Sequence, residues 1–167
     1  MKQQSNRGTV TAVALATLAV VVIIDQLSKW LAVATLPPRE PVPVLGDWFR
    51  FLLVRNPGAA FSMGTDATIV LAFIQLIAVG VAVFLAFRAR TGLSALTIGL
   101  IGGGAAGNLI DRIFREPGGM HGHVVDFFSF WNFAIFNVAD IAITVGVVLY
   151  LAIVFIAEPR AERKAAQ

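Results

Sequence analysis

Four long stretches without a charged side chain constrain this sequence more than any other feature. Residues 8–24, 67–87, 91–110 and 141–157 contain no Asp, Glu, Lys or Arg, and each is close to the roughly 20 residues that a helix needs to cross a bilayer. The chain is 57% hydrophobic and 14% charged, whereas about a quarter of the residues of a soluble domain are charged. The sequence therefore predicts an all-α membrane protein and excludes a water-soluble domain.

The apolar pattern predicts one integral-membrane domain over residues 1–167 with four transmembrane helices. The expected spans are about 9–32, 67–87, 92–113 and 135–157. The connecting segments opposite the termini are about 33–66 and 114–134. The first span imitates a secretory signal peptide, because the small residues Ala32 and Ala34 follow it. Asp25 and Lys29 precede that supposed cleavage site, so a retained span is the better interpretation.

Positive charges are distributed unevenly between the two ends of the spans. One side collects seven: Lys2, Arg7, Arg88, Arg90, Arg160, Arg163 and Lys164. The other side collects four: Arg39, Arg50, Arg55 and Arg115. Because Lys and Arg accumulate in cytoplasmic connections, we expect both termini in the cytoplasm and the two long segments outside it. The net charge of +3 does not indicate a nucleic-acid partner, since no basic stripe interleaves with aromatic residues.

The two extracytoplasmic segments have their own composition. Residues 41–54 combine β-branched and aromatic residues with turn formers, which is typical of short strands. Residues 127–133 are rich in Phe and Trp, as expected for a segment at the level of the lipid headgroups. Arg115 and Glu116 are interpreted as a helix end that reaches the headgroups.

Polar residues of the spans are expected to converge on the outer leaflet. A helix rises about 1.5 Å per residue, so Asp25 and Lys29 lie near the outer end of the first span. The same count places Asn108, Asp111 and Arg112 at the outer end of the third. Asn137 and Asp140 begin the fourth, and Asp126 precedes it. This convergence argues against an ion pathway, which needs polar groups across the whole membrane.

Three short patterns carry structural interpretations. Asp25 and Lys29 are spaced as i and i+4, which favours an ion pair on one helix face. Gly103 and Gly107 form a G-x-x-x-G motif that permits close helix packing in lipid, and no Walker lysine supports a phosphate loop. Asn108, Asp111 and Arg112 are expected to satisfy one another on adjoining helix turns.

Metal and thiol chemistry receive little support. The chain has no cysteine, which excludes a thiol nucleophile and Cys-ligated zinc. His121 and His123 lie beside Gly122 in a pattern that fits no standard zinc site. Solvated loop histidines are the preferred interpretation, with a metal site as a minor alternative, and no cofactor is expected.

Asp126 and Asp140 are the candidate catalytic pair. Two carboxylates in a partly desolvated site cannot easily both ionise, so one keeps its proton and the other becomes a general base. That asymmetry is what activating water against an amide requires, and the sequence does not say which Asp holds the proton. From the residues alone, two structural aspartates are an equal alternative.

Five motifs together resemble one family, the lipoprotein signal peptidases or type II signal peptidases. They are Asp25-Gln26-Leu27-Ser28-Lys29, Arg55-Asn56-Pro57-Gly58-Ala59-Ala60-Phe61-Ser62, Gly107-Asn108-Leu109-Ile110-Asp111-Arg112, Val125-Asp126-Phe127 and Phe136-Asn137-Val138-Ala139-Asp140. Each is weak alone, but their order and their spread over nearly the whole chain make the resemblance specific.

The resemblance implies a metal-free aspartyl endopeptidase of the bacterial cytoplasmic membrane. It implies four membrane helices, a small extracytoplasmic β-strand cradle and a short interfacial helix. The implied substrates are diacylglyceryl-modified prolipoproteins in contact with membrane lipids, cut just before the lipidated cysteine. Asp126 and Asp140 match the catalytic aspartates. The matching supporting residues are Asp25, Lys29, Asn56, Gly107, Asn108, Asp111, Arg112, Asn137 and Ala139. The stretch between the two aspartates is shorter than this family leads us to expect.

Two alternatives from other classes remain at this point. A small transporter or channel subunit would carry ionisable groups near the bilayer midplane, where this sequence has none. A non-catalytic assembly factor would tolerate Asp126→Asn, whereas an enzyme that depends on two aspartates would not.

Overall fold

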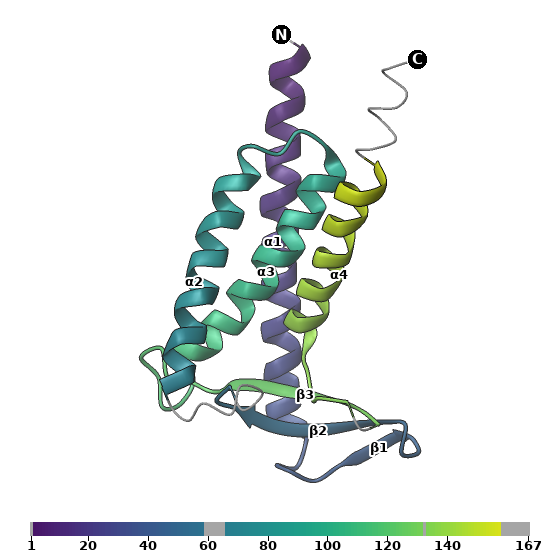
Figure 1. The fold of residues 1–167 in the computed structure, drawn as a ribbon. Helices are drawn as coiled ribbons and strands as arrows, with labels where there is room; N and C mark the ends of the chain where they lie inside the picture. The colour runs from purple at the N-terminus through teal and green to yellow at the C-terminus, as the bar shows by residue number, and fades with distance from the viewer. Residues whose placement is uncertain (1, 59–65, 132, 158–167) are drawn as a thin grey trace.

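The computed structural model describes residues 2–58, 66–131 and 133–157 of the chain. Within these residues, four membrane-length helices stand side by side and a three-stranded sheet closes one end of the bundle (Figure 1). The helices are α1 (Lys2–Thr35), α2 (Asp66–Ala86), α3 (Gly92–Phe114) and α4 (Val138–Ala152), which continues into the π-helical turn η2 (Ile153–Ala157). The strands are β1 (Val42–Leu45), β2 (Phe49–Asn56) and β3 (Val124–Phe130). The predicted membrane fold with a small sheet is confirmed.

Helix α3 is the centre of the bundle, with α2 and α4 on either side of it and α1 behind (Figure 1). Glycines at every fourth position of α3 face α1. A Cβ built on Gly99 would lie 2.5 Å from the Thr17 Cβ, and one on Gly103 would lie 2.7 Å from the Val21 Cβ. Both distances are shorter than real Cβ contacts, so the two helices pack at a separation that only glycine allows. The G-x-x-x-G motif thus packs as predicted.

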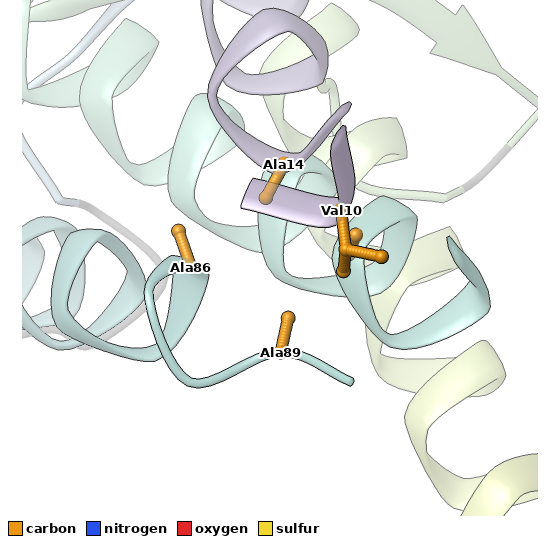
Figure 2. Packing of buried hydrophobic residues seen from close by; sticks show 5 residues of the cluster. Val10, Ala14, Ala86 and Ala89 are labelled. Carbon is orange, nitrogen blue, oxygen red and sulfur yellow. The ribbon is translucent and has the colours of Figure 1, made fainter. Parts of the chain in front are cut away.

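Small apolar residues hold the end of the bundle that carries the chain termini. Val10 and Ala14 of α1 meet Ala86 at the end of α2 and Ala89 in the following turn (Figure 2). The fifth member, Ala95, belongs to the first turns of α3. This cluster joins three helices at the end opposite the sheet.

At the other end, the sheet packs against α1. Its strand order is β1-β2-β3, with both pairs antiparallel. Ala32 of α1 forms a buried cluster with Leu53 of β2 and with Val125 and Phe127 of β3. Antiparallel pairing places Asp126 opposite Val54, so β3 carries a carboxylate to the end of the helix bundle.

The two segments expected to be extracytoplasmic differ from expectation in one respect. Their described residues contain the three strands but no separate short interfacial helix. The aromatic segment expected at the headgroups is largely β3, because pairing with β2 satisfies its backbone hydrogen bonds. Residues 59–65 lie outside the described part of the chain.

Helix α4 begins at Val138, three residues later than the sequence suggested. Asn137 is its N-cap and accepts a hydrogen bond from the Asp140 N–H, while Asp140 accepts one from the Asn137 N–H. This reciprocal capping box ends the preceding loop sharply, and it fixes the side chain of Asp140 at the start of the helix.

Candidate active site

The polar residues predicted to converge do meet at the sheet end of the bundle. They come from the ends of α1 and α3 nearest the sheet, from β3 and from the first turn of α4. Most are almost fully shielded from solvent: Asp25, Lys29, Asn108, Asp111, Arg112, Asp126 and Asn137 are all at most 5% exposed. So many buried polar groups in an apolar bundle require partners, because each would otherwise cost several kcal/mol.

Asp126 is held on both carboxylate oxygens by amide side chains. Asn137 Nδ2 donates to Oδ1 at 2.6 Å, and Asn56 Nδ2 donates to Oδ2 at 2.9 Å. Asn56 is itself positioned at the end of β2, where its Oδ1 accepts a hydrogen bond from the Gly58 N–H. The carboxyl group is therefore oriented from two different elements.

Asp140 is also held on both oxygens, but in a different setting. Asn108 Nδ2 donates to Oδ1 at 2.9 Å, and the Asn137 N–H donates to Oδ2 at 3.1 Å. Asp140 is half-buried and lies in the first turn of α4, where the helix dipole stabilises a negative charge. Asn137 contacts both aspartates and so links them across the fold.

Burial raises the pKa of the Asp126 carboxyl to about 6, from an ordinary value of 3.8. The hydrogen bond from Asn56 opposes this rise, whereas the nearby charge of Asp140 adds to it. The two carboxyl groups thus differ in environment in the way that separates an acid from a base. The Asp126 carboxyl therefore keeps its proton to a higher pH than an ordinary aspartate does.

Beneath the two aspartates lies a fully buried charge cluster centred on Lys29. Its Nζ is 2.8 Å from Asp25 Oδ2, 2.9 Å from Asp111 Oδ2 and 2.9 Å from Asn108 Oδ1. The predicted Asp25–Lys29 pair is therefore present, within a larger network. Asn108 connects this network to the site, because its amide nitrogen donates to Asp140.

Two predicted supporting residues act through their backbone. The Ala139 N–H donates to Asp25 Oδ1 at 3.0 Å, which ties the start of α4 to α1. A Cβ on Gly107 would lie 2.5 Å from Asp25 Oδ2, so glycine is needed for the carboxylate to reach Lys29. Both residues thus fix the position of the Asp25 side chain.

The expected trio of Asn108, Asp111 and Arg112 does not form. Asp111 bonds instead to Lys29 and to Arg115, and Arg112 Nε and Nη1 have no hydrogen-bond partner among the described residues. Their helical spacing allows the contacts, but Lys29 and Asp140 bond to Asn108, and Lys29 and Arg115 bond to Asp111. Arg112 remains a buried cation in the field of Asp126 and Asp140.

Sequence reasoning missed two members of the network. Arg115, interpreted as a headgroup contact, places its Nε 2.7 Å from Asp111 Oδ1. Gln26 Nε2 donates to the Gly107 carbonyl at 3.0 Å and to Asp111 Oδ1 at 3.2 Å. The i, i+4 spacing of Asp111 and Arg115 was the available signal, whereas Gln26 had none.

The described part of the chain contains no group of three or more His, Asp or Glu side chains suited to hold a metal ion. His121 is exposed, and its Nδ1 lies 3.0 Å from the Gly119 carbonyl oxygen in the same loop. Both histidines lie in the loop between α3 and β3.

The family model described as Signal peptidase (SPase) II matches residues 17–156. The chain belongs to the signal peptidase II family. The matched range contains every residue of the site described above, and family membership makes the protein an enzyme, a peptidase that cleaves signal peptides. The resemblance seen in the sequence is thereby confirmed.

Two lipoprotein signal peptidases are identical to this peptidase at nearly half of the aligned residues. A lipoprotein signal peptidase of Mycolicibacterium smegmatis is 48% identical over 142 residues, which is 83% of this chain and 59% of that protein. One from Rhodococcus jostii is 49% identical over 149 residues, 87% of this chain and 74% of that protein. The peptidase thus spans about three fifths of the first relative's length.

A solved structure described as a bacterial membrane enzyme has the same fold. Its TM-score against this peptidase is 0.74 at 27% identity, over 86% of this chain and 92% of the other. Together with the four membrane-length helices, these findings establish a multi-pass membrane peptidase.

Proposed function

We propose that this peptidase removes the signal peptide of diacylglyceryl-modified prolipoproteins by cutting just before the lipidated cysteine. Asp126 and Asp140 are the catalytic residues. The observation that carries this proposal is that Asn137 donates hydrogen bonds to both aspartates, from its side-chain amide to Asp126 and from its backbone N–H to Asp140. The family and its lipoprotein-processing relatives support the substrate class.

The reaction follows from the different environments of the two carboxyl groups. Asp140, charged at the helix N-terminus, takes a proton from a water molecule whose oxygen attacks the scissile carbonyl carbon. Asp126, with its raised pKa, holds a proton and donates it to the developing oxyanion. Collapse of the tetrahedral intermediate breaks the C–N bond, and the leaving amine takes up a proton from the pair.

The supporting residues keep this geometry. Asn56 and Asn108 each orient one aspartate, and the Lys29 cluster below them fixes Asn108. Arg112, which is buried and whose Nε and Nη1 have no hydrogen-bond partner among the described residues, supplies positive potential near the two aspartates. Four further residues support the structure around the site and do not bind the substrate: Asp25, Asp111, Gly107 and Ala139.

We propose that the enzyme lies in the bacterial cytoplasmic membrane with its site at the extracytoplasmic face. The excess of Lys and Arg on the side of the termini supports this orientation. A lipid-modified precursor anchored in the outer leaflet would present its scissile bond at the depth where β3 and the start of α4 meet. The candidate active site and the scissile bond would then lie at the same depth in the membrane.

Cleavage of a diacylglyceryl-modified precursor by detergent-purified enzyme tests the proposal. Asp126→Asn and Asp140→Asn should each lower turnover by about a thousandfold or more, because each removes a proton-transfer group. Asp47→Asn, an exposed position in the turn between β1 and β2, is the matched control and should cleave normally. Near-normal turnover by either folded site variant would rule out the two-aspartate mechanism.

A further inference from the structure

A large groove opens at the end of the bundle opposite the sheet. Its volume is about 900 Å³, and it is lined by α2, by α3 and by the end of α4 with η2. Figure 1 shows α3 between α2 and α4. The groove extends from the turn at residues 88–91 to Ile101 of α3, which is roughly 13 Å along the helix. It is thus separate from the site, which lies at the other end of the same helices.

The interior of the groove is apolar and shaped by small side chains. Ala78 and Ala82 form the α2 wall, Ile98 and Ile101 the floor, and Ile153 and Val154 the opposite wall. Such a surface at membrane depth suits a hydrocarbon chain. It offers few polar groups to a headgroup or a peptide backbone.

The mouth of the groove is positively charged. Arg88 and Arg90 line it, and no acidic residue is among the described residues that do so. The Arg88 guanidinium is held 4.9 Å from the centre of the Phe84 ring. Helix α3 starts at the same place, capped by Thr91, and the first N–H groups of a helix favour an anion.

We propose that this groove binds an anionic phospholipid of the leaflet on the side of the chain termini. One acyl chain lies along the apolar interior, and the phosphate is bound by Arg88, Arg90 and the first turn of α3. Charge complementarity decides the occupant. The cationic start of a signal peptide would meet two arginines at this mouth, whereas a lipid phosphate is attracted to them.

Thermal unfolding in detergent micelles containing either phosphatidylglycerol or phosphatidylcholine with the same acyl chains tests the site. Phosphatidylglycerol should raise the Tm of the wild type above the phosphatidylcholine value by a shift on the order of 3 °C. The double variant Arg88→Gln/Arg90→Gln should lose that difference. Arg90→Gln, which leaves the Arg88–Phe84 contact in place, should reduce it.

Two further variants separate the groove from general charge attraction. Ala78→Phe fills the interior of the groove but keeps both arginines. It should also lose the Tm difference between phosphatidylglycerol and phosphatidylcholine. Arg7→Gln removes one positive charge, as Arg90→Gln does, at the same end of the molecule but on α1 and outside the groove. This variant should keep the Tm difference between the two lipids. Equal Tm values of the wild type in both lipids, retention of the difference in the groove variants, or its loss in Arg7→Gln would each overturn the proposal.

Discussion

At the scale of single residues, the site is a set of buried polar groups that satisfy one another. Lys29 is completely buried, yet its ammonium group has two carboxylates and an amide oxygen within 2.9 Å. A buried charge without partners costs several kcal/mol, so the partners are a condition for folding. The same contacts orient Asn108 toward Asp140, so the stability of the fold and the geometry of the proposed site depend on common residues.

Replacing Lys29 by Met should destabilise the enzyme strongly. The change keeps the side-chain volume but leaves Asp25 and Asp111 buried without their shared cation, at a cost of about 3–5 kcal/mol. The free energy of unfolding in mixed micelles measures this loss. Arg115→Met is the matched control, because the Arg115 side chain is 21% exposed and its loss should cost much less. Equal losses of unfolding free energy in the two variants would show that the buried cluster stabilises the fold no more than the partly exposed ion pair does.

The raised pKa of Asp126 predicts a dependence of stability on pH. Between the ordinary pKa of 3.8 and the folded value of about 6, the unfolded carboxyl is ionised while the folded one keeps its proton. Stability is therefore highest at the acid end and falls as pH rises through about 6, by at most about 3 kcal/mol from this group. Unfolding measured from pH 4 to 7 should show the fall in the wild type and in Asp47→Asn. If the stability of Asp126→Asn falls by the same amount over this pH range, the pH dependence comes from another group.

At the scale of elements, α3 determines how closely the bundle packs. Its glycines remove side chains where α1 and α4 approach: a Cβ on Gly103 would lie 2.9 Å from the Leu18 carbonyl oxygen, and one on Gly104 would lie 2.4 Å from that of Ala139. Without these approaches, Asp25 on α1 would not reach the Ala139 N–H at the start of α4. Helix packing therefore sets the geometry of the site.

Gly103→Ala should destabilise the bundle, because the added methyl group must displace Val21 or the α1 backbone. We expect a loss of about 1–3 kcal/mol, which is typical of overpacking. Gly80→Ala in α2 is the matched control, since no atom lies within 4 Å of a Cβ built there. That variant should be neutral or gain up to about 1 kcal/mol from higher helix propensity. Unfolding of both variants in the same detergent is the measurement, and equal stabilities would contradict the close α1–α3 packing.

At the scale of the whole molecule, the two ends of the bundle have different chemistry. The sheet end holds the aspartates and the Lys29 network, whereas the opposite end holds an alanine-rich cluster and the groove lined by Arg88 and Arg90. One end thus suits catalysis at a membrane surface. The other suits anchoring in the opposite leaflet.

The absence of cysteine from the sequence makes the orientation easy to test. Single cysteines introduced as Glu40→Cys at the sheet end and Arg90→Cys at the other end replace exposed residues. In intact bacterial cells with a permeable outer envelope, a membrane-impermeant maleimide should label Glu40→Cys but not Arg90→Cys. Both should be labelled after lysis. The reverse pattern would mean that the site faces the cytoplasm.

The sequence by itself determined the properties that depend on residues close together in the chain. Four apolar stretches of bilayer length predicted the helices, and the rise per residue placed Asp25, Lys29 and Asn108 at one depth. The i, i+4 pair of Asp25 and Lys29 is likewise a local pattern. The family motifs identified Asp126 and Asp140 as candidate catalytic residues. Their catalytic role stays a prediction.

Only the tertiary structure decided which polar groups meet. Asn137 lies between the two aspartates, Lys29 takes Asp111 as a second carboxylate, and Arg112 lacks the neighbours that its helix position suggested. The strand character of the aromatic segment also depended on pairing with β2. The physical reason is that a buried polar group bonds to whatever the packing of several elements brings within about 3 Å, and spacing along one helix does not contain that information.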